Sequence, residues 1–433
     1  MRVVRRNTEL GLILLGTLVT VGAYLLASLA QDATIPANIG PFLGVVLGLQ
    51  LAAHVAIRKL APEADGTLIP IAGLLNGIGY VFIVRLDEAK THPQGLAGLQ
   101  SAWAVVGMIA FIGTLLVVRR VRDLERYRWT IGALGIAILL LPLAPGIGRQ
   151  INGARIWVGI GPASFQPGEF AKILLALFFA SYLVEKRELL AVSHFRLGPI
   201  ALPDLKHLGP VLLAWGVSLV VMISEKDLGS SLLFFALFVA LLWVATERAS
   251  YLLVGVVLFA GGAILANHEF THVQDRVAIW LDPWEDPKDD GFQIVESQFA
   301  FAAGGVSGTG INLGSPTRIP YAETDFIFAA IGEELGLVGA TAVLIAYLLM
   351  IGAGLRIALR TTVPFERLLA TGLTVLLGVQ SFIIIAGVTR VLPLTGVTLP
   401  FVSYGGSSLI ANYVLLALLL RISDDTAHRE AGR

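Results

Sequence analysis

Twelve long apolar runs constrain the fold of this 433-residue chain more than any other feature of its sequence. A bilayer core about 30 Å thick is spanned by roughly 20 apolar residues of helix, because unpaired backbone groups are too costly in lipid for other open structures. We therefore predict an all-α polytopic membrane protein with about 12 transmembrane helices. The predicted spans are residues 10–30, 39–57, 68–84, 99–118, 129–143, 170–184, 208–223, 228–245, 251–266, 326–351, 368–388 and 407–420.

The composition agrees with a membrane protein and excludes several classes of function. The chain is 56% hydrophobic with a mean hydropathy of +0.79, and its charged residues make up 14%, against about 25% in soluble domains. The 31 Lys and Arg balance 31 Asp and Glu, so the net charge gives no reason to expect a nucleic-acid partner. Because there is no Cys, disulfides, Cys-ligated zinc and thiol catalysis are excluded.

The distribution of positive charge predicts the orientation of the spans. Short cytoplasmic loops accumulate Lys and Arg, and five Arg lie within residues 119–128. If that loop is cytoplasmic, both termini are cytoplasmic too. The longest polar stretch, residues 268–324, then lies outside the cell, as does a second polar loop, residues 145–168. The first of these loops contains several Trp and Phe, so we expect it to be ordered, and we expect the chemistry on the outer face.

Asp325 stands where the longer outer loop meets an apolar span. An acidic residue there suits a helix N-terminus, and this capping interpretation stays open. A carboxylate partly shielded from water also has a raised pKa and can act as a general base, and the two interpretations are compatible. Glu333 and Glu334 follow within the span, but at about 100° per residue they point in different directions. We expect them to pair with other helices rather than to share one site.

Two further segments contain candidate ligand-binding groups. Glu169 and Lys172 lie three residues apart near the outer end of a span, which favours a helical ion pair. Alternatively, Lys172 and Arg155 supply cations to a phosphate-bearing ligand. Ser403 and the pair Gly405-Gly406 precede the last span, where glycines allow close approach to backbone N–H groups that can bind an anion. A plain Gly-rich turn is the alternative there.

Taken in order, six segments of the chain resemble the FtsW/RodA/SpoVE family, the SEDS proteins. The resemblance extends over roughly residues 68–422. The segments are Gly153-Ala154-Arg155-Ile156-Trp157, Phe165-Gln166-Pro167-Gly168-Glu169-Phe170-Ala171-Lys172, Asp227-Leu228-Gly229, Asp282-Pro283-Trp284, Thr324-Asp325-Phe326-Ile327-Phe328 with Glu333-Glu334-Leu335-Gly336, and Pro393-Leu394-Thr395-Gly396 with Leu399-Pro400-Phe401 and Ser403-Tyr404-Gly405-Gly406-Ser407-Ser408.

The resemblance implies a peptidoglycan glycosyltransferase. Such enzymes polymerise lipid II at the outer face of the bacterial cytoplasmic membrane, among membrane lipids, and work with a class B penicillin-binding protein in cell elongation or division. It implies a ten-helix core over residues 63–423 with an extracellular loop at 268–325, two added helices in residues 1–62 and a cytoplasmic tail at 424–433. The family's essential acidic residue matches Asp325. The substrate-binding candidates are Arg155, Trp157, Gln166, Glu169, Lys172, Glu323, Ser403, Gly405 and Gly406.

The chain departs from the family pattern at several positions. Glu323 stands where a His is common, Gly168 where a Ser is common, and Ile156 where a second Arg is common. The usual Gln-Pro is missing before Asp227, and the usual Asn and Gly are missing around Arg390. These changes concern substrate-binding detail more than the acidic residue itself.

We expect Asp325 to act as the base in an inverting transfer between two lipid-linked sugars. The leaving diphosphate needs positive charge, for which Arg155, Lys172 and a divalent cation, Mg²⁺ or Mn²⁺, are the candidates. The metal ligands are unknown. Two other hypotheses stay open at this point. The first is a transporter that flips lipid II, and the second is a scaffold that recruits the penicillin-binding protein and does not need Asp325.

Overall fold

Helices dominate the computed structural model of the chain. It describes residues 2–32, 39–90, 92–151, 154–160, 163–191, 193–197, 200–203, 216, 225 and 227–432. Helices occupy eleven of the twelve predicted spans, and the remaining one, residues 208–223, lies outside the described residues except for Gly216. Within the described part, nine helices are long and apolar enough to cross a membrane. The prediction of an all-α polytopic membrane protein is therefore confirmed.

The chain divides into two compact units. Unit 1 consists of Met1–Arg119, Arg276–Ala353 and Gln380–Arg433, and unit 2 consists of Arg120–Asp275 and Gly354–Val379. Each unit combines segments that are far apart in sequence. The predicted boundaries after residues 62 and 423 follow the family pattern instead, and they stay predictions.

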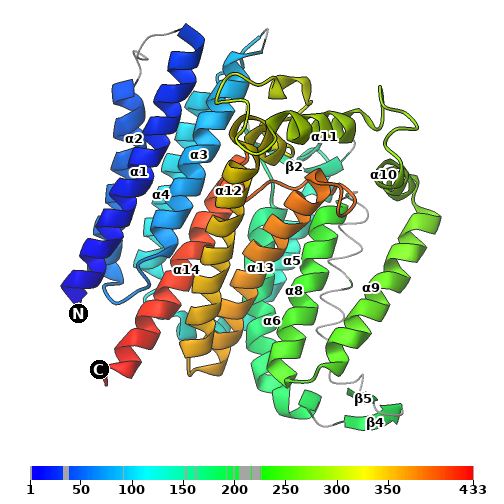
Figure 1. The fold of residues 1–433 in the computed structure, drawn as a ribbon. Coiled ribbons are helices and arrows are strands. Elements are labelled where there is room, and N and C mark those ends of the chain that lie inside the picture. Colours follow the sequence, from blue (N-terminus) through cyan, green and yellow to red (C-terminus); the bar gives the residue numbers. More distant parts are fainter. Residues whose placement is uncertain are drawn as a thin grey trace. The chain divides into compact units, whose positions relative to one another are not determined.

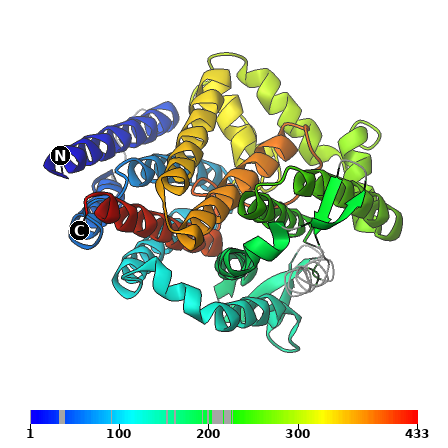
Figure 2. The ribbon, with the colours of Figure 1, turned by 90° about the horizontal axis from the view of Figure 1, so that it is seen from below.

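Unit 1 contains the two N-terminal helices and the C-terminal helix (Figure 1). Helix α1 (Arg2–Asp32) packs on α3 (Leu68–Glu88), and α2 (Ile39–Leu60) packs on α4 (Leu96–Val117). Helix α14 (Gly406–Glu430) also lies against α4. Figure 1 and Figure 2 both show the N and C labels near each other at one end of this unit, so the two termini share a face.

A buried polar network holds the N-terminal helices to the segment that follows them. The Arg6 guanidinium pairs with Glu9 and donates hydrogen bonds to the carbonyl oxygens of Ala61 and Ala64, at 3.2 and 2.7 Å. The second carboxylate oxygen of Glu9 lies 2.8 Å from Nδ1 of His54 in α2. All three ionisable side chains are buried. Helices α1 and α2 are therefore joined to each other as well as to the rest of unit 1.

The long outer loop is ordered, as predicted. It contains α10 (Thr271–Leu281), α11 (Phe292–Gly304) and the short 3-10 helix η3 (Pro316–Arg318). Figure 1 shows α11 at the end of unit 1 opposite the termini. With an even number of spans and cytoplasmic termini, this is the end expected for the outer face.

Helix α12 (Ile327–Arg360) breaks at Gly336, where φ is 66° and ψ is −166°. A Cβ on Gly336 would lie 2.3 Å from a backbone nitrogen, so only glycine fits. Segment 305–310 fills the break. Two of its N–H groups donate hydrogen bonds to the carbonyl oxygens of Glu333 and Glu334. Two of its carbonyl oxygens accept hydrogen bonds from the N–H groups of the two residues after Gly336. Non-helical backbone within a membrane is tolerated where protein satisfies it. No break was predicted within the apolar run of residues 326–351.

Helix α13 (Pro364–Val388) precedes the loop that leads to α14. Its last turn, which belongs to unit 1, receives a buried hydrogen bond of 3.2 Å from the Ser297 hydroxyl of α11 to the carbonyl oxygen of Val388. This contact holds the outer loop against the start of the segment that joins the last two helices.

In the described part of unit 2, successive helices pack on one another along the chain. Helix α5 (Arg128–Leu140) packs on α6 (Gly168–Ala191), α6 on α8 (Leu228–Thr246), and α8 on α9 (Ser250–Glu269). Short 3-10 helices, η1 (Val121–Tyr127) and η2 (Leu141–Leu143), flank α5.

Small sheets complete unit 2, and the sequence analysis did not predict them. The loop before α6 forms three antiparallel strands, β1 (Gly148–Ile151), β2 (Ala154–Ile160) and β3 (Ala163–Phe165). Strands β4 (Ser193–Leu197) and β5 (Ile200–Pro203) pair after α6. The β-hairpins are short loop structures, so the helical class of the protein is unchanged.

Candidate active site

Asp325 lies in the turn before α12, and its side chain is partly exposed. Burial by the surrounding protein raises the pKa of the carboxyl group to about 6. The charge of Arg276 and a hydrogen bond with Thr324 act in the opposite direction and lower the pKa, whereas the charge of Glu323 raises it. The carboxylate is therefore mostly ionised at neutral pH and still basic enough to accept a proton from a hydroxyl group.

Two contacts with the loop before α14 hold the backbone next to Asp325. The Ser403 hydroxyl donates a 2.5 Å hydrogen bond to the carbonyl oxygen of Thr324. The backbone N–H of Tyr404 donates a 2.8 Å hydrogen bond to the carbonyl oxygen of Glu323. Two of the predicted site residues, Ser403 and Glu323, thus lie beside Asp325 in unit 1.

The side chain of Glu323 forms an ion pair with Lys90. Its Oε1 lies 2.5 Å from Nζ of Lys90, and Glu323 is buried. Lys90 lies two residues after α3, so this pair joins the C-terminal end of that helix to the turn before α12. Sequence reasoning did not single out Lys90.

Gly405 immediately precedes α14 and Gly406 is its first residue, and packing accounts for the small size of Gly406. A Cβ on Gly406 would lie 2.3 Å from the indole ring of Trp103 in α4. Gly405 has an extended backbone conformation, and a Cβ there would lie 3.1 Å from Thr398. The space beside the Cα of Gly406 is thus filled by protein, and substrate binding through the glycine N–H groups stays a prediction.

Glu333 and Glu334 do not face one common site, as predicted. Glu333 Oε1 accepts a 2.7 Å hydrogen bond from the backbone N–H of Ser315. Glu334 forms a buried ion pair of 3.2 Å with Arg85 of α3 and accepts a 3.0 Å hydrogen bond from the N–H of Asn312. Both carboxylates therefore anchor the outer loop just before the break in α12, and Glu334 also pairs with another helix.

The remaining predicted site residues belong to unit 2. Lys172 Nζ lies 2.7 Å from Glu169 Oε2, and both side chains are buried, at 2% and 4% exposure. The ion pair that the spacing predicted is present, and it offsets the charge that Lys172 offers to a ligand. Gln166 lies just before α6, where its carbonyl oxygen accepts a 3.3 Å hydrogen bond from the N–H of Glu169.

Arg155 and Trp157 are part of strand β2, where both side chains are partly exposed. The backbone N–H of Arg155 donates a 3.1 Å hydrogen bond to the carbonyl oxygen of Glu225. Glu225 is itself buried, and burial, together with the charge of Asp227, raises the pKa of its carboxyl group to about 8. The Asp227 side chain caps α8 by accepting a 3.0 Å hydrogen bond from the N–H of Ser230.

Arg276 of α10 is the main residue near Asp325 that sequence reasoning missed. A Cβ on Gly396 would lie 3.8 Å from both Nη2 of Arg276 and Oδ2 of Asp325. The guanidinium and the carboxylate therefore face one small space above Gly396, whose φ is +71°. No motif marks Arg276, and the available signal is that a Lys or Arg is uncommon in the predicted outer segments.

No group of three or more His, Cys, Asp or Glu that could hold a metal ion occurs among the residues that the structure describes. The carboxylates near Asp325 are already engaged, since Glu323 pairs with Lys90. The described side chains around Asp325 thus do not fit a metal site built from protein ligands.

Comparison with known proteins identifies the family. A family model described as "Cell cycle protein", for the FtsW/RodA/SpoVE proteins, matches residues 66–428. The chain belongs to the FtsW/RodA/SpoVE family. The match includes residues of both units and all the predicted site residues.

Several similar proteins are named as peptidoglycan glycosyltransferases. Peptidoglycan glycosyltransferase RodA of Mycobacterium tuberculosis (strain H37Rv) is 46% identical over 97% of this chain and 90% of its own length. RodA of Mycobacterium leprae is 44% identical over 98% of this chain and 91% of its own length. The probable peptidoglycan glycosyltransferase FtsW of Geobacter metallireducens is 35% identical, over 83% of this chain and 94% of its own length. The mycobacterial matches cover nearly the whole chain and so extend into the two N-terminal helices.

Solved structures show the same fold. One, described as "Structural coordination of polymerization and crosslinking by a peptidoglycan synthase complex", has a chain that matches with a TM-score of 0.69 and 28% identity, over 84% of this chain and 98% of that chain. The rod shape determining protein RodA of Thermus thermophilus matches with a TM-score of 0.60 and 26% identity, over 84% of this chain and 97% of that chain.

Proposed function

We propose that this chain is a peptidoglycan glycosyltransferase that polymerises lipid II into glycan strands, for cell elongation or division. Its membership of the FtsW/RodA/SpoVE family and the names of its relatives support this activity. The observation in the structure that carries the proposal is the environment of Asp325. This carboxyl group lies before α12 with a pKa raised to about 6, beside the cation of Arg276.

In the proposed reaction, Asp325 removes the proton from the sugar 4-hydroxyl of an acceptor lipid II. The hydroxyl oxygen bonds to the anomeric carbon of the growing chain, and the bond from that carbon to the diphosphate oxygen breaks. The electron pair leaves with the lipid diphosphate. A single carboxylate base suits a direct displacement, which inverts the configuration at the anomeric carbon.

The reaction takes place at the outer face of the bacterial cytoplasmic membrane, with both termini in the cytoplasm. The concentration of Arg in residues 119–128 supports this orientation. Substrate and lipid tails enter from the surrounding membrane lipids. The predicted substrate-binding residues of unit 2, above all Arg155 and Lys172, are proposed to contact the phosphate-bearing substrate.

A class B penicillin-binding protein is the proposed partner, because it supplies the crosslinking that completes the polymer. The similar structure of a peptidoglycan synthase complex that coordinates polymerization and crosslinking supports such a partnership. A divalent cation, Mg²⁺ or Mn²⁺, is proposed as an additional source of positive charge for the leaving diphosphate.

The test is polymerisation by the purified protein with its partner transpeptidase and labelled lipid II. We expect glycan strands from the wild type and none from Asp325→Ala. Asp289→Ala, which changes an exposed carboxylate in the same outer loop, is the matched control and should retain activity. Normal strands from Asp325→Ala would disprove the role of this carboxylate.

A transporter that flips lipid II is the second candidate, because the break in α12 resembles the broken helices of many transporters. However, backbone groups of segment 305–310 satisfy the break, and Glu334 pairs with Arg85. Movement of fluorescent lipid II across liposomes without polymer formation would favour the transporter.

A further inference from the structure

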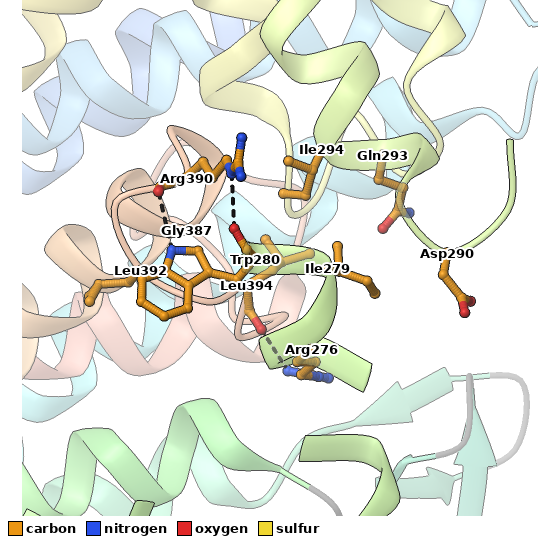
Figure 3. A pocket seen from close by; sticks show the side chains of 10 residues that line it. All are labelled: Arg276, Ile279, Trp280, Asp290, Gln293, Ile294, Gly387, Arg390, Leu392 and Leu394. Atoms are coloured by element: carbon orange, nitrogen blue, oxygen red, sulfur yellow. Dashed lines mark hydrogen bonds between the residues drawn. The ribbon is translucent and has the colours of Figure 1, made fainter. Parts of the chain in front are cut away.

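A pocket of about 60 Å³ lies where α10 and α11 meet the end of α13 and the loop that leads to α14 (Figure 3). Two guanidinium groups, those of Arg276 and Arg390, line it together with one carboxylate, that of Asp290. Apolar side chains form much of the remaining wall. Two Arg and one Asp give the lining an excess of positive charge, which favours an anionic ligand with phosphate oxygens.

Arg276 connects this pocket to Asp325. Its Nη1 donates a 3.0 Å hydrogen bond to the carbonyl oxygen of Leu394, which fixes the guanidinium against the loop before α14. Its Nη2 and the Asp325 Oδ2 approach the same point above Gly396, each at 3.8 Å from the position of a Cβ there. A substrate that enters this space meets a base on one side and a fixed cation on the other.

We infer that Arg276 is a further catalytic residue, which contacts the diphosphate that leaves during glycosyl transfer; this inference rests on the proposed function. In an inverting displacement, the hydroxyl attacks one face of the anomeric carbon while the diphosphate departs from the opposite face. The proton moves to Asp325, the carbon–oxygen bond to the diphosphate breaks, and its electron pair remains on the diphosphate oxygen. Arg276 stabilises that developing charge.

Arg390 and Trp280 hold Arg276 in place as positioning residues. Trp280 lies four residues after Arg276, so both side chains project from one face of α10. The Trp280 Nε1 donates a 3.2 Å hydrogen bond to the carbonyl oxygen of Arg390. In return, the Arg390 guanidinium donates to the carbonyl oxygens of Trp280 and Leu281, at 2.9 and 2.5 Å, at the C-terminal end of α10. Figure 3 shows this reciprocal pair between Trp280 and Arg390.

The backbone at Arg390 indicates that these hydrogen bonds have a specific role. Its φ is 60°, in the left-handed region that favours glycine, and a non-glycine residue there is uncommon. Arg390 also stands in the segment where the chain departs from the usual family sequence. An arginine held in this conformation gains three hydrogen bonds to α10, which offset the conformational strain.

The first experiment measures inhibition of polymerisation by added lipid diphosphate and lipid monophosphate, in the complex with the transpeptidase. We expect the wild type to be inhibited more strongly by the diphosphate. Arg276→Met should lose about 10² to 10³-fold in kcat and also lose the preference for diphosphate. Arg276→Lys should recover part of both. The exposed Arg318→Met is the matched control and should behave as the wild type.

The outcomes separate this inference from the proposed function. If the wild type forms no glycan, the proposed function fails. If the wild type polymerises and Arg276→Met retains its rate and its preference for diphosphate, the inference on Arg276 is overturned. Should Arg276→Met not fold, Arg276→Lys decides instead, because an ammonium group cannot donate to the Leu394 carbonyl and the diphosphate in the geometry of the guanidinium, which should weaken diphosphate inhibition about 10-fold. Unchanged inhibition would overturn the inference.

The second experiment tests the positioning role with Arg390→Gly. Glycine adopts the left-handed conformation without strain, so the variant should fold with a Tm near that of the wild type. Without the hydrogen bonds to α10, Arg276 should move away from Asp325, and the acidic limb of the pH–rate profile should shift to higher pH. A profile and rate identical to the wild type would overturn the positioning role, because a merely structural change would not move the pH dependence.

Discussion

The Ser403 hydroxyl donates a 2.5 Å hydrogen bond to the carbonyl oxygen of Thr324, the residue before the proposed base. Ser403 Oγ also accepts a 2.9 Å hydrogen bond from the N–H of Leu399, which closes the turn from Leu399 to Ser403. Ser403 thus holds this turn against the residues just before α12. Ser403 is buried. A residue predicted to bind substrate is thus hydrogen-bonded to the backbone next to Asp325.

We expect Ser403→Ala to lower both stability and activity. Loss of the buried hydrogen bonds should cost about 1 to 3 kcal/mol of unfolding free energy. Polymerisation should fall more than stability alone explains, because the turn that carries Asp325 is released. Thermal unfolding and strand formation are the measurements. Ser101→Ala removes a hydroxyl that donates a hydrogen bond to the carbonyl oxygen of Ala97 within α4, and a comparable loss of activity in that control would contradict the prediction.

The rate of polymerisation should depend on pH through Asp325. The pKa of this carboxyl group is raised to about 6, and a base must be deprotonated to act. We expect the rate to fall as the pH is lowered through about 6. Glu323→Gln removes a charge that raises the pKa, so its acidic limb should move to lower pH. A limb that stays in place would argue against coupling between the two carboxyl groups.

Asp325 should also lower the stability of the protein at neutral pH. Its pKa is about 6 in the folded protein against an ordinary value of 3.8 for an aspartate, so folding favours the protonated form. The protonated carboxyl group therefore stabilises the folded state fully below the unfolded pKa of 3.8. This contribution is lost as the pH rises through about 6. We therefore expect Asp325→Asn to raise Tm at pH 8 and to change it little at pH 3. A lower Tm at pH 8 would contradict this account.

Glu334 should be essential for folding of the region around the break in α12. Glu334→Gln leaves the buried Arg85 without its charge partner, which should cost on the order of 3 to 5 kcal/mol. The double variant Arg85→Met with Glu334→Gln should be more stable than the single variant, because no buried charge remains uncompensated. Thermal unfolding in detergent measures both. Equal stability of the two variants would mean that the ion pair has no such role.

Variants of Glu169 and Lys172 distinguish a structural function of this ion pair from a function in substrate binding. Each of Glu169→Gln and Lys172→Met should destabilise the protein, because each leaves one buried charge unpaired. The double variant should recover stability. We expect polymerisation to stay lost in the double variant, since Lys172 is proposed to contact the substrate. Recovery of activity together with stability would show that the two residues only form an ion pair.

Much of the fold could be predicted because its signals are local. An apolar run of sufficient length forms a helix in a membrane whatever surrounds it, so eleven predicted spans are helices in the described structure. The break at Gly336 could not be predicted in this way, since it depends on segment 305–310 entering from another part of the chain. The strands β1 to β3 were missed for a related reason, because their pairing needs contacts between short segments without strong apolar alternation.

The sequence by itself determined the membrane class, the family resemblance and the choice of Asp325, since these depend on runs and motifs of neighbouring residues. Only the tertiary structure decided which groups surround that carboxylate. Arg276 and Ser403 are distant from Asp325 in sequence, and packing of α10 and the loop before α14 brings them to it. The pKa of Asp325 follows from burial and neighbouring charge, which exist only once these segments have come together.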